Sequence, residues 1–378
     1  MTLSSVATSA SRLPGDPARE RLRIDTPHGE LALDPAIGNL PELVFRHGGR
    51  RLVPLAAAPW ADEPDTLPEG EALAPVERRL AGDFFCAPFG ANDVETGPPH
   101  GWSANSRWRC TARGVGTLEL VLERRIMGAT IGKRLVLAHD APLLYQTHVV
   151  DGGEDGLSVA HHPMIRSEGT ARLCVSPKRA VLVVDPPLDH GRHRLAAGAH
   201  VLDPSAVPAE GGGTIDITRL PIAERHDDFV TLVESAERTI GWSAVLRDVE
   251  DDIVFFLKNP VVLPVTMLWH SNGGRDHAPW NGRHRGVLGV EDGCSAEASG
   301  HRAALADNRL TRLGVPSALA LAPGRRHRVA HVTGCIARPR GWESISDISI
   351  DGPTLSLASD SGETLRLPFD ATFFKERH

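Results

Sequence analysis

Short apolar runs, rich in Val, Leu and Ile, recur along the chain and are separated by turn-forming residues. In the run 117–125, Leu118 and Leu120 alternate with more polar positions, as in a strand with one buried face. Two similar runs, 134–138 and 143–150, follow it closely. The spacing of roughly ten residues from one run to the next is typical of a large sandwich or barrel.

The same pattern continues toward the C-terminus. Further candidate strands are 171–175, 180–184, 229–233, 240–246, 253–257, 261–269, 317–321 and 326–333. The 37 glycines and 29 prolines supply turns between them. The sequence therefore predicts an all-β fold, a large antiparallel β-sandwich with one or few short helices.

One segment, 302–313, has helical rather than strand periodicity. Its apolar side chains, from Ala303 to Leu313, fall at helical spacing, and Gly314 followed by Pro316 would end the helix. A single helix among so many strands is expected to decorate the sandwich.

Two stretches without periodicity, 59–75 and 185–213, are expected to be long surface loops. The length of 378 residues permits one large β domain or two ordinary domains, but no flexible linker separates the runs. We therefore predict a flexible N-terminal lead-in, 1–20, and a single domain, 21–378, that includes a hairpin around 345–367.

Composition narrows the possible partners and compartment. The chain has 48 acidic and 41 basic residues, and its net charge of −7 repels phosphate backbones and anionic lipid surfaces. The longest apolar runs, 253–257 and 261–269, are too short to span a membrane. The five cysteines include no Cys-x-x-Cys pair, and the N-terminus lacks the apolar core of a secretory signal. These features favour a cytoplasmic protein that binds neither nucleic acid nor membranes.

Three short segments carry the residues of chemical interest. The first, 98–108, contains His100-Gly101-Trp102 and then Trp108, and the second, 157–165, contains His161-His162-Pro163. The third, 286–291, is apolar and ends in Glu291. In their order and spacing, these segments resemble the aldose 1-epimerase, or galactose mutarotase-like, family. The resemblance covers roughly residues 25–335.

The resemblance implies the β-sandwich of that family and its activity, the interconversion of the α and β anomers of an aldose. By position in the motifs, His162 would be the acid and Glu291 the base. His100 and Asp227 would bind the sugar, although the adjacent Asp228 could serve equally well. We expect no requirement for a metal or an organic cofactor.

Other substrate contacts are less closely defined by the motifs. The segment 82–93 resembles the early sugar-contacting loop of the family, and within it we expect Asn92 to bind the substrate. The family's arginine in this loop has no clear counterpart here. Arg275, Arg283 and Arg285 precede the Glu291 segment, and we expect Arg283 to be a substrate contact. An arginine at the site could recognise an anionic sugar, such as a sugar phosphate, by charge-assisted bonds.

The proposed chemistry suits a carboxylate and an imidazole. To open a cyclic hemiacetal, one group must take the proton of the anomeric hydroxyl while another protonates the ring oxygen. A nearby carboxylate is expected to hold the histidine protonated near neutral pH. Because successive strand side chains point to opposite faces, only one of His161 and His162 can face a pocket. The resemblance selects His162, which directly precedes Pro163.

Two functions of other classes stay open. One is a non-catalytic carbohydrate-binding protein of the same fold, because a fold does not determine a function. The other is a metalloenzyme that uses some of the 18 histidines, although the chain has no His-Glu-x-x-His motif. In each reading of this fold the expected partner is a small-molecule sugar. The sequence does not determine the oligomeric state.

Overall fold

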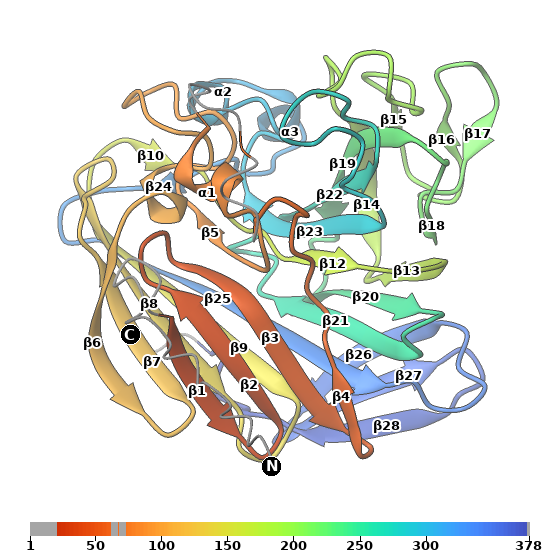
Figure 1. Ribbon diagram of the computed structural model, residues 1–378. Coiled ribbons are helices and arrows are strands. Elements are labelled where there is room, and N and C mark those ends of the chain that lie inside the picture. The colour runs from red at the N-terminus through yellow and green to blue at the C-terminus, as the bar shows by residue number, and fades with distance from the viewer. Residues whose placement is uncertain (1–20, 62–66, 68–72, 376–378) are drawn as a thin grey trace, which may run out of the picture.

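Strands dominate the structure, a computed structural model that describes residues 21–61, 67 and 73–375 (Figure 1). Two large antiparallel sheets lie face to face, and the predicted all-β sandwich is confirmed. The predicted lead-in, 1–20, and most of the predicted loop at 59–75 lie outside the described residues.

The larger sheet has nine strands. In spatial order they are β18 (Arg219–Leu220), β13 (Ala171–Val175), β20 (Gly241–Arg247), β21 (Asp252–Lys258), β25 (Arg326–Ala337), β9 (Leu143–Gly152), β8 (Ala129–Leu137), β7 (Thr117–Leu122) and β6 (Trp108–Gly114). The strands β7, β8 and β9 form the meander that the alternating pattern predicts.

The second sheet has eight strands and carries the candidate site. In spatial order they are β15 (His200–Val201), β14 (Lys178–Val183), β19 (His226–Glu234), β22 (Val265–Asn272), β23 (Val287–Cys294), β11 (Val159–His161) and β5 (Phe85–Cys86), with β12 (Met164–Arg166) also paired to β23. Every residue of β19 and β23 is buried, because one face packs on the larger sheet and loops cover the other.

Smaller sheets surround these two. A four-stranded sheet of β1 (Leu22–Thr26), β2 (Gly29–Asp34), β3 (Asn39–His47) and β4 (Arg50–Leu52) packs against β8 and β25. Two short pairs join β10 (Gly156–Leu157) to β24 (Leu319–Ala320) and β16 (Val207–Pro208) to β17 (Thr214–Ile215). The predicted loop 185–213 is irregular apart from β15 and β16.

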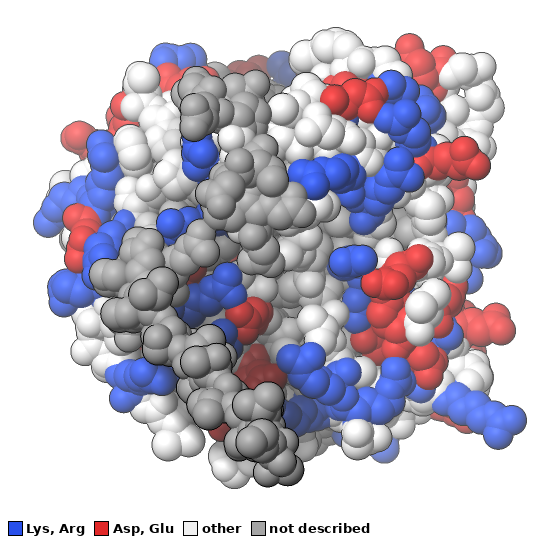
Figure 2. Space-filling model, in the orientation of Figure 1, with Lys and Arg blue, Asp and Glu red and all other residues white. Residues whose placement is uncertain are grey.

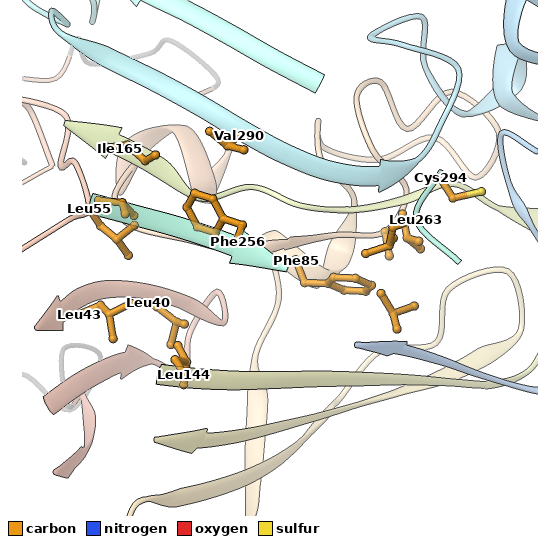
Figure 3. Packing of buried hydrophobic residues seen from close by; sticks show 14 of the residues in the cluster. Leu40, Leu43, Leu55, Phe85, Leu144, Ile165, Phe256, Leu263, Val290 and Cys294 are labelled. Atoms are coloured by element: carbon orange, nitrogen blue, oxygen red, sulfur yellow. The ribbon is translucent and has the colours of Figure 1, made fainter. Parts of the chain in front are cut away.

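The main core lies between the large sheets. Val290 and Ile165 come from the eight-stranded sheet and Phe256 from the nine-stranded sheet, and all three are at most 1% exposed (Figure 3). Leu40 and Leu43 of the N-terminal sheet join the same cluster. Burial of apolar area at about 25 cal/mol per Å² makes this layer the main source of stability.

A third sheet covers the outer face of the nine-stranded sheet. The predicted C-terminal hairpin is in fact three strands, β26 (Ile345–Asp351), β27 (Thr354–Ser359) and β28 (Thr364–Pro368) (Figure 1). In β21, Val254 and Phe256 face the main core, whereas Phe255 and Leu257 pack toward this third sheet. The continuous apolar run of β21 therefore serves two hydrophobic layers, which explains why it lacks alternation.

The prediction of one continuous helix over 302–313 is wrong. The structure has two short helices there, α2 (His301–Leu305) and α3 (Arg309–Arg312). Asn308 separates them, because its side chain accepts hydrogen bonds from the first amides of α3 and donates to the carbonyls of Ala303 and Ala306. The one other α-helix of the described residues, α1 (Pro75–Arg78), begins at Pro75.

The surface agrees with the composition. Lys and Arg side chains are interspersed with Asp and Glu on the face drawn in Figure 2. Among the described residues, the helices are all too short to cross a membrane.

The C-terminal sheet is expected to be an integral part of the fold. Leu357→Ala removes a fully buried side chain from the layer between β27 and the nine-stranded sheet. The free energy of unfolding should fall by about 2–5 kcal/mol, as measured by urea denaturation. The control Leu202→Ala, at a leucine that is 71% exposed, should change it by less than about 0.5 kcal/mol. Equal stability of the two variants would show that the third sheet only rests on the surface.

Candidate active site

A pocket lies on the outer face of the eight-stranded sheet, on the side where α1, α2 and α3 cover it in Figure 1. Its volume is about 190 Å³, smaller than the sites of drug-sized ligands. Aromatic rings and a few ionisable groups dominate its walls. The lining residues are Val76, Glu77, Leu80, Phe89, Gly90, Pro99, His100, His162, Leu188, Phe229, Trp269, Arg275, Trp280, Glu291 and Ala298.

Strand register brings His162 and Glu291 together in this pocket. Met164 of β12 pairs with Gly289 of β23, so the antiparallel register places His162 opposite Glu291. The imidazole Nε2 lies 3.2 Å from the carboxylate Oε1, and both side chains are almost fully buried. Gly289 leaves the space that the carboxylate occupies, because a Cβ on Gly289 would lie 2.5 Å from Oε1.

The alternation of strand side chains decides which of two adjacent residues faces the pocket. β11 ends at His161, and the ring of His161 points into the sandwich, where it stacks on His331. His162 points the other way and stacks on Phe84, with ring centroids 4.4 Å apart. The backbone N–H of His162 donates to the Phe84 carbonyl at 2.9 Å, which fixes the turn before Pro163.

The same rule separates Asp227 from Asp228 in β19. Asp228 points to the sandwich interior, where it accepts hydrogen bonds from His226 Nδ1 at 2.9 Å and from the amides of Arg194 and Leu195. Asp227 lies on the pocket side, and its carboxylate accepts from Trp269 Nε1 at 3.1 Å and from Arg275 Nη2 at 3.1 Å. Asp227 is not itself a lining residue, but through these bonds it holds two lining residues, Trp269 and Arg275.

His100 forms the wall opposite Arg275. Its ring lies edge-on to His162, with centroids 5.0 Å apart, and against Phe84 and Phe89. Its Nδ1 lies 3.5 Å from the sulfur of Cys86. Burial, together with the charge of Arg275, lowers the pKa of His100 to about 4, so this ring is neutral at physiological pH.

Arg275 and two tryptophans form the second wall. The guanidinium lies 5.0 Å from the ring centroid of Trp269 and 4.6 Å from that of Trp280. His284 stacks on Trp269 at 5.2 Å, and its Nδ1 is 2.9 Å from the Ser271 hydroxyl. This packing holds the two tryptophans in the same pocket wall as His162 and Glu291.

Burial shifts both members of the pair toward their neutral forms. Desolvation raises the pKa of Glu291 well above its usual range, and Asp227 adds to this effect while Arg275 opposes it. Desolvation and His100 lower the pKa of His162 well below its usual range. These directions run against the expectation that the carboxylate holds His162 protonated, because burial disfavours both charges.

Two expected contacts lie away from the pocket. Asn92 is buried near Gly97 and Trp102, outside the lining, whereas its neighbours Phe89 and Gly90 line the pocket. Arg283 is exposed and is also outside the lining. In both cases the expected segment borders the pocket, but the fold of the loop turns a different side chain inward.

Arg275 lines the pocket, although the sequence analysis favoured Arg283 over it. Its position beside Trp280, in a loop that leads to the Glu291 strand, was the available signal. Within the described part of the chain, no three His, Cys, Asp or Glu residues are grouped so that they could hold a metal ion.

Comparison with solved structures finds this fold in proteins named for sugar chemistry. A protein from Escherichia coli K12 named as a "putative aldose 1-epimerase" matches with a TM-score of 0.56 and 14% identity, over 84% of this chain and 98% of that one. A galactose mutarotase related enzyme from Lactobacillus acidophilus matches with a TM-score of 0.56 and 12% identity, over 84% and 97%. A galactose mutarotase-like protein from Lactobacillus casei ATCC 334 matches with a TM-score of 0.54 and 12% identity, over 84% and 100%.

Sequence comparison alone finds no such neighbour, because no family model and no curated protein matches the chain. At identities of 12–14%, the structural likeness is one of fold. The chain has the galactose mutarotase-like β-sandwich fold that the three sequence segments imply.

Proposed function

We propose that this protein is a mutarotase of the aldose 1-epimerase kind, which interconverts the α and β anomers of an aldose with His162 and Glu291 as its acid–base pair. The observation that carries the proposal is the contact of these two side chains, 3.2 Å apart, at an aromatic-walled pocket. One carboxylate and one imidazole are the groups that ring opening requires.

A cyclic sugar can replace the contact between the two side chains. Its anomeric hydroxyl is a donor and its ring oxygen is an acceptor, so each can pair with one member. Glu291 also has an acceptor without a partner, because its buried Oε2 makes no hydrogen bond within the described structure. One member takes the anomeric proton while the other protonates the ring oxygen. After rotation about the bond next to the carbonyl, the two groups exchange roles and close the ring as the other anomer.

The reaction needs one proton shared by the pair. A protonated Glu291 beside a neutral His162 holds the same number of protons as a carboxylate beside an imidazolium. Burial favours the first arrangement, because neither group then carries a charge. Both arrangements contain one donor and one acceptor, so either can begin the ring opening, and only the direction of the first proton transfer differs.

The size and charge of the pocket favour a neutral monosaccharide. A volume of about 190 Å³ suits one small ring rather than a chain of sugars. Arg275 is the one Lys or Arg among the lining residues, all of which are described, and Asp227 already pairs with it at 3.1 Å. Because Asp227 pairs with Arg275 and Glu77 also lines the pocket, an anionic substrate would meet little uncompensated positive charge. Trp269 and Trp280 line the pocket and can supply apolar contacts to a sugar ring.

Glu291→Gln tests the role of the carboxylate. The amide keeps the shape of the side chain but cannot exchange the proton, so turnover should fall by about 10²- to 10⁴-fold. Polarimetry or NMR exchange of α and β aldoses measures the rate, and a thermal shift with the same sugars measures binding. Wild-type rates in this variant would remove Glu291 from the mechanism. Sugar binding without turnover by the wild-type protein would instead favour a non-catalytic carbohydrate-binding protein.

Gly289→Ala tests the position of the carboxylate without changing it. The added Cβ would lie 2.5 Å from Glu291 Oε1 and must push this flexible side chain away from His162. We expect a rate at least about 10-fold lower in a variant that circular dichroism shows to be folded. Gly132→Ala in β8 is the matched control, because its Cβ would meet only the Leu120 carbonyl oxygen, at 3.9 Å, and its rate should be unchanged. Equal rates for the two variants would contradict the assigned geometry.

The pH dependence of kcat/KM should be bell-shaped. Activity should fall as the pH drops through the pKa of His162, because the pair then holds two protons. It should also fall as the pH rises through the pKa of Glu291, because the pair then holds none. Since burial lowers the first pKa and raises the second, the acid limb should lie below the usual imidazole range and the alkaline limb above the usual carboxyl range. A rate profile with its acid limb at the usual pKa of imidazole, about 6.5, would contradict this.

A further inference from the structure

Directly behind the acid–base pair, the sandwich interior is polar rather than apolar. Asp292 follows Glu291 in β23 and points to the other face, and His161 precedes His162 and does the same. Both are at most 1% exposed. The residue next to each member of the pair therefore faces the sandwich interior: His161 beside His162, and Asp292 beside Glu291.

His331 contacts both of these residues from the opposite sheet. It lies in β25, is fully buried, and its Nε2 is 2.9 Å from Asp292 Oδ2. Its ring also stacks on that of His161, with centroids 4.3 Å apart and planes 15° apart. One side chain thus connects the strand of Glu291 to the segment of His162.

Buried polar groups also bind the second carboxylate oxygen of Asp292. Lys258 Nζ lies 2.8 Å from Asp292 Oδ1, and the Thr266 hydroxyl donates to the same oxygen at 2.7 Å. Lys258 also pairs with Glu234 at 3.0 Å. Burial would raise the pKa of Asp292, but Lys258 and His331 outweigh it and hold that pKa well below the usual range, so Asp292 is a fixed anion.

The His162 segment has a second interior support. Asp83 accepts a hydrogen bond from the His162 amide at 3.1 Å and from Gln146 Nε2 at 2.6 Å. Gln146 is the residue that pairs with His331 in the β9–β25 ladder. The interior polar groups therefore form one connected layer under both members of the pair.

We propose that His331 is a positioning residue of the site, which fixes the separation of His162 and Glu291 from the side opposite the pocket through its bond to Asp292 and its contact with His161. The inference rests on the proposed function. A hydrogen bond and a ring stack are directional, so they resist the sliding of strands that an apolar contact would permit. A displacement of about 1 Å between catalytic groups can cost about 10²-fold in rate.

The test compares three variants of the full chain in the anomer-exchange assay. His331→Phe keeps a flat ring against His161 but removes the bond to Asp292, and its kcat should fall by about 10- to 100-fold with KM within about twofold of the wild-type value. His331→Gln, whose amide can donate to Asp292, should recover kcat to within about threefold. Thr333→Val is the matched control, because Thr333 is equally buried in the same strand and its hydroxyl has no partner within the described structure, so kcat should be unchanged.

Circular dichroism and a thermal melt establish that each variant is folded. A folded His331→Phe variant with wild-type kcat, or one that changes only KM, would overturn the proposal while leaving the mutarotase function standing. A kcat loss in Thr333→Val as large as that in His331→Phe would also overturn it, because the effect would then follow any interior change. If His331→Phe does not fold, Asp292→Asn replaces it in the test, because this substitution keeps the side-chain shape and weakens the same bond. A lower kcat in folded Asp292→Asn would support the proposal, and a wild-type kcat would overturn it. A wild-type protein that turns over no aldose would refute the proposed function itself.

Discussion

The register between β23 and the β11–β12 segment is the constraint on which the candidate site depends. Met164 opposite Gly289 places His162 opposite Glu291, and strand alternation then sends His161 and Asp292 to the reverse face. A slip of one residue would exchange the two faces, so that Asp292 would enter the pocket and Glu291 the sandwich interior. The pocket and the polar interior layer are therefore two consequences of one pairing.

Desolvation gives this arrangement its chemical character. The loops over the outer face remove water from His162 and Glu291, and each pKa moves toward the neutral form. The same loss of water strengthens any hydrogen bond that a substrate makes there. Arg275 and Asp227 form a pair that contributes little net charge, so the field at Glu291 comes from opposing neighbours rather than from one dominant ion. Such a site suits a substrate that itself carries no charge.

Sequence reasoning predicted the fold, and it brought forward the proposed pair, but it did not predict which loop side chains line the pocket. Strand runs are local patterns, and a local pattern survives in a single sequence. His162 and Glu291 were placed instead by the resemblance of their segments to the aldose 1-epimerase family. Whether Arg275 or Arg283 faces the pocket depends on how the loop 273–286 folds between two strands, and its sequence has no periodicity. The same holds for Asn92, which lies outside the lining. The predicted helix 302–313 is divided by a side-chain cap at Asn308 that competes with helical periodicity.

The polar interior layer poses an energetic question that the apolar core does not. A buried ion pair such as Lys258–Asp292 is often no more stabilising than apolar residues of the same volume, because removing two charges from water offsets their attraction. In most of the sandwich, Leu, Val and Phe fill this space. Behind His162 and Glu291 the chain instead has charges and hydrogen bonds. The directional geometry of these bonds permits only one arrangement of the strands, whereas apolar contacts permit several. We therefore interpret the layer as a source of specificity rather than of net stability, located where an error of about 1 Å in strand position would most affect the proposed reaction.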